Sequence, residues 1–241
     1  MYRKVFYIIV IMSLFINNSC KNNLSEPIDT EIEYSGEITD IEGNIYNTIQ
    51  IGNQLWMADN LRTTKYCNGD EINDTTGFIN WELIMTGTFC NYNHDENFVS
   101  SYGRLYNWFA VNDHRGLAPV GWHIPSDDDW KELEEYLGMS QEEADMVGPR
   151  ENNEVGLKLK STSGWYDNGN GTNESGFTAV PSGFCGNYGD FDGDGFDAIF
   201  WSSTLNNEDI PWRRGLGYIA IGVARYSNGK NYGFSVRCIK D

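Results

Sequence analysis

Apolar residues recur at helical spacing near the middle of the chain. Trp130, Leu133 and Leu137 are separated by three and four residues, which predicts a helix over 127–137 with one buried face. Ser126 stands where an N-cap is expected, and the three acidic residues after it suit the positive end of the helix dipole. This stripe places Trp130 in the hydrophobic core.

Two shorter helices are expected on either side of that one. Leu105 and Trp108 lie at helical spacing, which predicts a short helix over 102–112. Ser140 is followed three residues later by Glu143, a capping-box pattern that predicts another short helix.

The second half of the chain shows the pattern of strands. Apolar stretches bounded by glycine and polar residues predict strands at 177–184, 199–204, 217–225 and 233–239. Further strands are expected at 43–51 and 54–61. Short helices in the first half and a mostly antiparallel sheet in the second give the α+β class. The 26 glycines indicate a loop-rich domain.

The N-terminus has the pattern of an exported protein. A short basic start precedes an apolar run over 5–16, as in a signal peptide, here predicted over 1–19. Cys20 directly follows Ser19, as in the lipobox of bacterial lipoproteins, where the cysteine thiol is acylated. Asn17 departs from the leucine usual at that position, and ordinary secretion with cleavage nearby is the alternative.

The remainder divides into a polar tether over 20–35 and one domain over 36–241, long enough for a sizeable core. An acylated Cys20 would anchor the protein to the bacterial outer membrane or cell surface, each buried methylene contributing roughly 0.8 kcal/mol. Contact with the membrane is expected through this acyl anchor alone.

The charge of the chain narrows the choice of partners. The formal net charge is −18, and loss of residues 1–19, with two basic residues and no acid, makes it −20. Such an acidic protein without a basic patch is not expected to bind nucleic acid.

Four cysteines remain beside Cys20: Cys67, Cys90, Cys185 and Cys238. An even number in an exported chain predicts disulfides, with three possible connectivities. Free buried thiols are the alternative. The wide spacings suggest neither a zinc site nor a redox pair.

Long aromatic and glycine-containing blocks give the chain its most specific resemblance. In this order, the blocks at 102–111, 121–130, 200–204 and 232–241 resemble the Fibrobacter succinogenes major paralogous domain family. The resemblance extends over 36–241. It implies a domain found in bacterial lipoproteins and surface proteins.

The same resemblance implies a C-type-lectin-like fold. It also favours a Cys90–Cys238 disulfide, and with it Cys67–Cys185, because members of the family commonly carry counterparts of Cys90 and Cys238. The calcium and sugar motifs of the sugar-binding C-type lectins are absent, since Trp201 is followed by two serines instead of Asn and Asp. The lectin mechanism therefore does not transfer with the fold.

One acidic loop has the spacing of a calcium site. Asp190, Asp192 and Asp194 alternate along the chain, Gly195 follows them, and Asp197 could complete the set. Calcium prefers several oxygen ligands in a bent loop of this kind. Calcium is thus a possible cofactor, and an acidic surface hairpin is the alternative.

Aromatic residues in Gly- and Asn-rich loops are the candidate ligand contacts. Trp165, Tyr166, Tyr188 and Trp212 could stack on sugar rings, with Asn168 binding hydroxyl groups. Burial of these aromatics in small satellite cores is the alternative.

No sequence pattern of a known catalytic centre is present, so we expect a protein that is not an enzyme. The leading hypothesis is an envelope-anchored binding or adhesion module for a polysaccharide or glycoprotein. The alternatives are a structural or assembly lipoprotein that binds another envelope protein, and a carbohydrate-active enzyme.

Overall fold

The computed structural model describes residues 32–77 and 80–241. The predicted signal peptide over 1–19 and the lipidation site Cys20 lie outside these residues. The compact unit of the described residues includes Ile32, which packs against the core.

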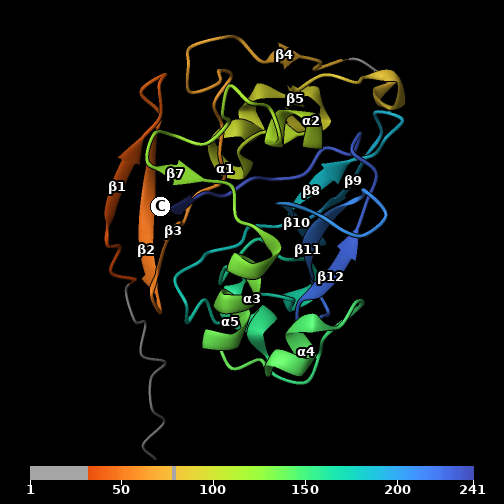
Figure 1. Cartoon of the computed structure of the whole chain (residues 1–241). Helices are drawn as coiled ribbons and strands as arrows, with labels where there is room; N and C mark the ends of the chain where they lie inside the picture. Colours follow the sequence, from red (N-terminus) through yellow and green to blue (C-terminus); the bar gives the residue numbers. More distant parts are fainter. Residues whose placement is uncertain (1–31, 78–79) are drawn as a thin grey trace, which may run out of the picture. The chain divides into compact units, whose positions relative to one another are not determined.

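The first sheet joins the two ends of the domain. It contains β1 (Gly36–Thr39), β2 (Ile45–Ile51), β3 (Gln54–Met57), β7 (Trp122–His123) and β13 (Ile239–Lys240). The strand order is β1-β2-β3-β13-β7, and every pair is antiparallel. The last strand of the chain therefore lies between β3 and β7, and the C-terminus lies beside these strands (Figure 1).

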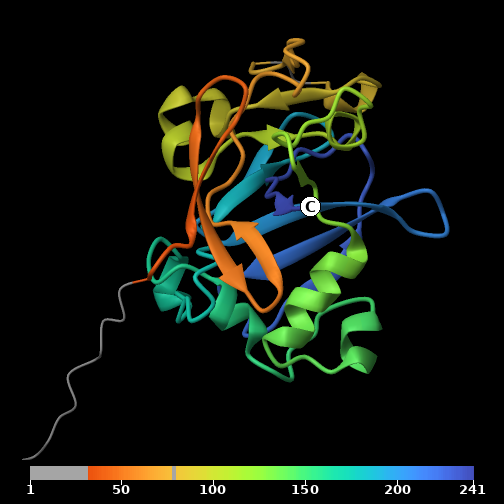
Figure 2. The same ribbon diagram turned by 60° about the vertical axis from the view of Figure 1, so that its left-hand side comes forward.

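The second sheet is built from the second half of the chain. It contains β8 (Ser182–Cys185), β9 (Phe191–Asp194), β10 (Asp197–Leu205), β11 (Pro211–Gly217) and β12 (Ala224–Ser227), in the order β12-β11-β10-β8-β9. All pairs are antiparallel except β8 with β10. The tip of the β10–β11 hairpin projects at the right of Figure 2.

A small third sheet is flanked by single-turn helices. It has the order β4 (Asn73–Asp74), β5 (Thr88–Cys90), β6 (Leu105–Tyr106), with α1 (Val99–Tyr102) and α2 (Trp108–Val111) beside β6 in sequence. The 3-10 helices of the described residues are η1 (Trp81–Leu83), η2 (Tyr92–His94), η3 (Glu96–Phe98) and η4 (Tyr166–Asn168).

The prediction of one helix over 102–112 is wrong. Gly103 has a φ of +72°, and a Cβ there would lie 2.7 Å from the carbonyl oxygen of Leu61. This left-handed residue ends α1, the next residues pair with β5, and Asn107 caps α2.

The predicted central helix is confirmed as α3 (Asp127–Tyr136). The Ser126 hydroxyl accepts from the Asp129 N–H at 3.1 Å, and the Asp129 carboxylate accepts from the Ser126 N–H at 2.7 Å. The helix expected after Ser140 is α4 (Gln141–Asp145). A further helix, α5 (Val155–Leu159), lies near these two at the bottom of Figure 1.

Several of the predicted strands differ from the observed ones. The stretch expected as a strand over 233–239 forms isolated bridges at Gly233, Phe234 and Ser235, and β13 begins only at Ile239. The prediction of a strand over 217–225 is wrong, because the middle of that stretch is the turn between β11 and β12. The Lys160 amine holds this turn by donating to the carbonyl oxygens of Gly217, Tyr218 and Ala220. The strand expected over 177–184 begins only at Ser182.

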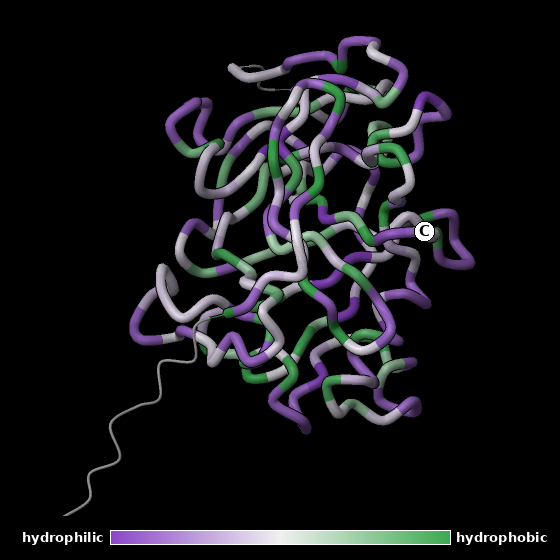
Figure 3. The backbone as a smooth tube through the Cα atoms, turned by 90° about the vertical axis from the view of Figure 1, so that its left-hand side faces the viewer, coloured by the Kyte–Doolittle hydropathy of each residue, from purple (hydrophilic) through white to green (hydrophobic). Residues whose placement is uncertain are grey.

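Trp130 is a core residue, as its spacing predicts, with 1% of its surface exposed. Its ring lies 5.0 Å from that of Trp56 and 5.8 Å from those of Phe177 and Phe200. Apolar segments run through the interior, and hydrophilic segments lie mostly on outer loops (Figure 3).

A network of buried charges joins α3 to the second sheet. Asp127 accepts from Arg214 at 2.8 Å and from Arg225 at 2.6 Å. Glu134, about two turns further along the same face of α3, accepts from Arg214 at 2.7 Å and from Arg150 at 2.6 Å. All five side chains are less than a tenth exposed. Each carboxylate is thus shared by two guanidinium groups, which offsets part of the cost of burying the charges.

The arginines set the protonation of Asp127. Burial alone would raise the pKa of this carboxyl, but hydrogen bonds and charge from Arg225 and Arg214 outweigh it and hold the pKa well below its usual value. Because the pKa is lower in the folded state, ionised Asp127 stabilises the fold above the unfolded-state pKa of about 3.9.

Replacement of Asp127 by Asn should lower the free energy of unfolding at neutral pH by about 3 to 5 kcal/mol, because it leaves two buried arginines partly unpaired. The difference from the parent should shrink as the pH falls below about 4, where Asp127 of the unfolded chain becomes protonated, and should vanish only below the lowered pKa of the folded state. Denaturant melts across this pH range measure both effects. Asp128→Asn is the control, since the Asp128 side chain is 94% exposed. Equal losses in the two variants would contradict the role of the network.

Candidate functional site

A cleft with a volume of about 560 Å³ lies on the second sheet. Arg214 and Arg225 point from β11 and β12 toward α3, while their neighbours Arg213 and Tyr226 line the cleft. Because successive side chains of a strand point to opposite faces, the cleft occupies the face away from α3.

Small residues form the floor of the cleft and aromatic residues its walls. No large side chain rises from this part of the sheet, because it is formed by Gly215 and Gly217 of β11 and Ala224 of β12. A Cβ on Gly215 would lie 2.6 Å from Nη1 of Arg213, so even alanine there would displace the guanidinium. The aromatic residues that line the cleft are Phe184, Tyr226, Tyr232 and Phe234.

Arg213 presents free hydrogen-bond donors to this cleft. Its Nε donates to the Asn228 side-chain oxygen at 2.6 Å, and its guanidinium lies 5.2 Å from the centre of the Tyr226 ring. Neither Nη atom has an acceptor among residues 32–77 and 80–241. Burial lowers the pKa of Arg213, but an arginine remains charged at neutral pH.

Asp197, at the start of β10, presents free acceptors to the same cleft. It is half-buried, and no group in the described part of the chain donates a hydrogen bond to its carboxylate. Burial raises its pKa, the positive charge of Arg213 lowers it, and Asp192 raises it slightly further. The cleft therefore holds a donor and an acceptor that both lack protein partners, beside aromatic rings.

This combination suits a ligand that carries hydroxyl groups on an apolar ring. A hydroxyl can accept from the Arg213 guanidinium and donate to the Asp197 carboxylate at once. Few polar groups in a mostly apolar, aromatic recess are typical of small-ligand sites.

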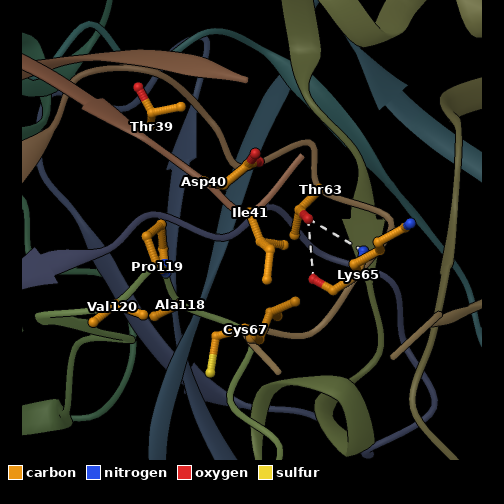
Figure 4. A pocket seen from close by; sticks show the side chains of 10 residues that line it. Thr39, Asp40, Ile41, Thr63, Lys65, Cys67, Ala118, Pro119 and Val120 are labelled. Atoms are coloured by element: carbon orange, nitrogen blue, oxygen red, sulfur yellow. Dashed lines mark hydrogen bonds between the residues drawn. The ribbon is translucent and has the colours of Figure 1, made fainter. Parts of the chain in front are cut away.

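A second pocket, of about 200 Å³, lies beside β1 and is lined by Asp40, Thr63, Lys65 and aliphatic residues (Figure 4). Its polar groups already have partners. The Asp40 carboxylate accepts from the Tyr46 hydroxyl and from the backbone of the same turn, and Lys65 pairs with Glu71 at 3.1 Å. It offers a ligand less than the cleft on the second sheet does.

None of the aromatic residues predicted as ligand contacts lines that cleft. Trp165 was expected in an exposed loop, but it is 5% exposed and its indole N–H donates to Ser161, so its assignment as a ligand contact is wrong. Trp212 is half-buried, with the Arg225 guanidinium 3.7 Å from its ring centre.

The other predicted contacts are exposed but lie elsewhere. Tyr166 stacks on Phe196 with 4.5 Å between ring centres, and Asn168 is exposed beside it in sequence. Tyr188 is 62% exposed in the turn between β8 and β9. These residues form no common recess with Arg213.

The predicted calcium loop comprises β9, the turn that follows it and the start of β10. Asp190, Asp192 and Asp194 are exposed, and Asp194 accepts from the Tyr102 hydroxyl at 2.7 Å, while Asp197 faces the cleft. The described residues contain no group of three or more His, Cys, Asp or Glu side chains able to hold a metal ion. Calcium binding by this loop stays a prediction that would require the carboxylates to move together.

Cys67, Cys90, Cys185 and Cys238 are all free thiols in the structure. Cys90 and Cys185 lie together in one buried cluster, whereas Cys238 lies in a different one. The Cys67 thiol, which is half-buried, donates to the backbone oxygen of Arg115. The expected Cys90–Cys238 and Cys67–Cys185 pairs stay predictions that this arrangement does not favour.

The sequence analysis missed Arg213. Adjacent arginines in a strand must point to opposite faces. When one of them enters the core, the other lies on the free face, and this signal was available at Arg213 and Arg214. The strand itself was placed too late in the sequence for that signal to be used.

A family model described as the Fibrobacter succinogenes major domain matches residues 49–240. No curated protein and no solved structure gives a significant match. No helix of the described residues is long and apolar enough to span a membrane.

Replacement of Asp197 by Asn should leave the domain as stable at pH 7 or make it more stable. The folded-state pKa of Asp197 is raised, so its contribution is most favourable below the unfolded-state pKa of about 3.9 and is lost as the pH rises through the folded-state value. Thermal melts at pH 4 and pH 7 measure this difference, with Asp128→Asn, whose side chain is 94% exposed, as the control. A clear loss of stability at pH 7 would assign Asp197 a structural role.

Proposed function

The chain belongs to the Fibrobacter succinogenes major domain family, and we propose that it is a cell-envelope lipoprotein whose domain binds carbohydrate without catalysis. The ligand would be a polysaccharide or the glycan of a glycoprotein, bound in the cleft on the second sheet. The observation that carries this proposal is an aromatic recess lined by both Arg213 and Asp197, in which the Nη donors of Arg213 and the carboxylate of Asp197 have no hydrogen-bond partner among the described residues.

The shape and chemistry of the cleft support a sugar as ligand. Tyr226 and Tyr232 offer ring faces at the wall, and the low floor of Gly215 and Gly217 leaves room for a pyranose-sized group. Aromatic faces bind the apolar face of a sugar while charged groups bind its hydroxyls. Asn228, which holds Arg213 in place, adds a polar group at the rim.

The second carboxylate of the cleft supports binding over catalysis. Glycoside hydrolysis commonly uses two carboxyl groups on either side of the scissile bond. Besides Asp197, the cleft contains Glu151, whose Oε2 accepts from the backbone N–H groups of Ile221 and Gly222 at 2.9 and 2.8 Å. These two hydrogen bonds occupy Oε2 of Glu151 and hold its side chain at the rim of the cleft.

Export and acylation follow from the N-terminal pattern. The basic start, the apolar run and Ser19–Cys20 support anchoring at the outer membrane or cell surface through acyl chains. The acidic domain would be repelled by anionic lipid, which leaves the cleft available to ligands outside. We also propose a C-type-lectin-like architecture, supported by the sheet that joins both ends of the domain.

A glycan array probed with residues 21–241, with and without calcium, tests the binding function. Glycans bound by the parent should lose affinity by about tenfold or more in Arg213→Gln and in Asp197→Asn, because each change removes a charge-assisted hydrogen bond. Asp192→Asn and Tyr188→Ala, which lie outside the cleft, are the controls and should bind as the parent does.

The controls also separate the alternatives. Loss of binding in Tyr188→Ala alone would move the site to the exposed loops. Binding that requires calcium and is lost in Asp192→Asn would favour the acidic hairpin. An array without any bound glycan would overturn the proposal and favour an assembly role with an envelope protein.

Replacement of Cys20 by Ser should release the protein from the membrane fraction or leave the uncleaved precursor, because serine cannot accept the thioether-linked lipid. Detergent phase partitioning and intact mass measure this change. Cys67→Ser is the control, since it removes a thiol from the folded domain and should leave membrane anchoring intact. Unchanged partitioning and mass in Cys20→Ser would exclude acylation at this residue.

A further inference from the structure

Two cysteines from distant parts of the chain meet in one apolar cluster. Cys90 ends β5 and Cys185 ends β8, and both side chains are fully buried. The aromatic residue Trp81 closes the same cluster, together with Tyr92 and Leu105. Burial raises the pKa of Cys90, and the neighbouring thiol of Cys185 adds to this effect, in agreement with the place of both residues in one cluster.

The other two cysteines are held away from this pair. Cys238 packs in the cluster around Trp201, and its thiol is fully buried there. The Cys67 thiol donates a hydrogen bond to the backbone oxygen of Arg115. Among the described thiols, Cys90 and Cys185 are the two that share one cluster. A disulfide requires the Cα atoms of its two cysteines to lie within about 7 Å of each other, so residues of one cluster are the candidates.

The pair lies directly behind the aromatic wall of the cleft. Cys185 exchanges two backbone hydrogen bonds with Gly233, at 2.9 and 2.8 Å. The residues on either side of this bridge, Phe184, Tyr232 and Phe234, line the cleft. A Cβ on Gly233 would lie 2.9 Å from Cβ of Cys185, so the two segments are in close contact.

We propose that Cys90 and Cys185 form a disulfide in the exported protein, and that this bond fixes the Phe184, Tyr232 and Phe234 wall of the cleft. The bond would link β5 of the third sheet to β8 of the second sheet. Its existence does not depend on carbohydrate binding. Its effect on ligand affinity rests on the proposed function.

The chemistry requires an external disulfide, either of a protein oxidant or of a small molecule such as oxidised glutathione. One cysteine thiolate attacks the external disulfide and releases one thiol, and the second cysteine then displaces the other. In total the two cysteines lose two protons and two electrons, and the external disulfide is reduced to two thiols. Because the thiolate is the nucleophile and burial disfavours it, we expect the bond to form before the cluster closes.

Mass spectrometry of the full-length protein isolated from cell envelopes under alkylating, non-reducing conditions tests the bond. The expected result is a linked pair of peptides that contain Cys90 and Cys185, with Cys67 and Cys238 alkylated after denaturation. The linked species should be lighter by two hydrogen atoms than the reduced one. Alkylation of all four thiols, or a different pairing, would overturn the proposal.

Reduction of the same protein tests the structural effect. A bond that closes a long loop in a domain of this size should, when reduced, lower the melting temperature by on the order of 10 °C. The peptide that spans 232–234 should also exchange its backbone hydrogens faster. The Cys90→Ala, Cys185→Ala double variant should melt like the reduced parent and be insensitive to reductant.

Cys67→Ser is the matched control, and it should keep the full response to reductant. If the double variant does not fold, the comparison of oxidised and reduced parent protein still decides the question. A melting temperature and exchange pattern unaffected by reductant would contradict the structural role of the bond. If mass spectrometry shows the bond but its reduction leaves glycan affinity unchanged, the bond contributes to stability alone. The binding proposal would then stand without it.

Discussion

The buried contact between α3 and the second sheet is the constraint on which the rest of the domain depends. Ionised Asp127 and Glu134 cannot be buried at acceptable free energy unless Arg214, Arg225 and Arg150 reach them. The helix must therefore lie at one position and one rotation against β11 and β12. The apolar stripe of α3 alone would tolerate sliding, whereas paired charges with fixed directions do not. The hydrophobic core and the buried ion pairs thus specify the same arrangement of α3 against the second sheet.

The buried ion pairs also determine on which face of the second sheet the cleft lies. Because they fix which face of β11 and β12 meets α3, they determine that Arg213 and Tyr226 point the other way. The contrast among the arginines is informative. Arg237 is fully buried and donates to Asn60 and to backbone oxygens, and burial lowers its pKa to about 9. Arg214 is shared between two carboxylates. Arg213 has a partner for Nε alone, which distinguishes a side chain kept for a ligand from side chains kept for the fold.

Sequence reasoning located the parts of the fold that depend on local signals. The helix after Ser126 was predicted because its cap, its acidic first turn and its apolar stripe are all local. The helix over 102–112 failed because a close backbone contact at Gly103, made with a distant segment, overrides helical spacing. The cleft could not be predicted, since its residues come from β8, β10, β11 and β12 and meet only through strand pairing. Trp165 was misassigned because loop composition predicts exposure, whereas its indole is paired with Ser161 in the core.

The acidic residues of the domain have different roles. Asp127 is an acid whose charge the fold stabilises, and its pKa is lowered; Asp197 is an acid whose charge the fold tolerates, and its pKa is raised. A carboxylate held at a free-energy cost, without a donor of its own, gains more from a ligand hydroxyl than a satisfied one does. Arg213 is already positioned by Asn228, so a ligand need not order that side chain on binding. The same sheet therefore carries satisfied charges on the face that supports the fold and unsatisfied charges on the face that is open to a ligand.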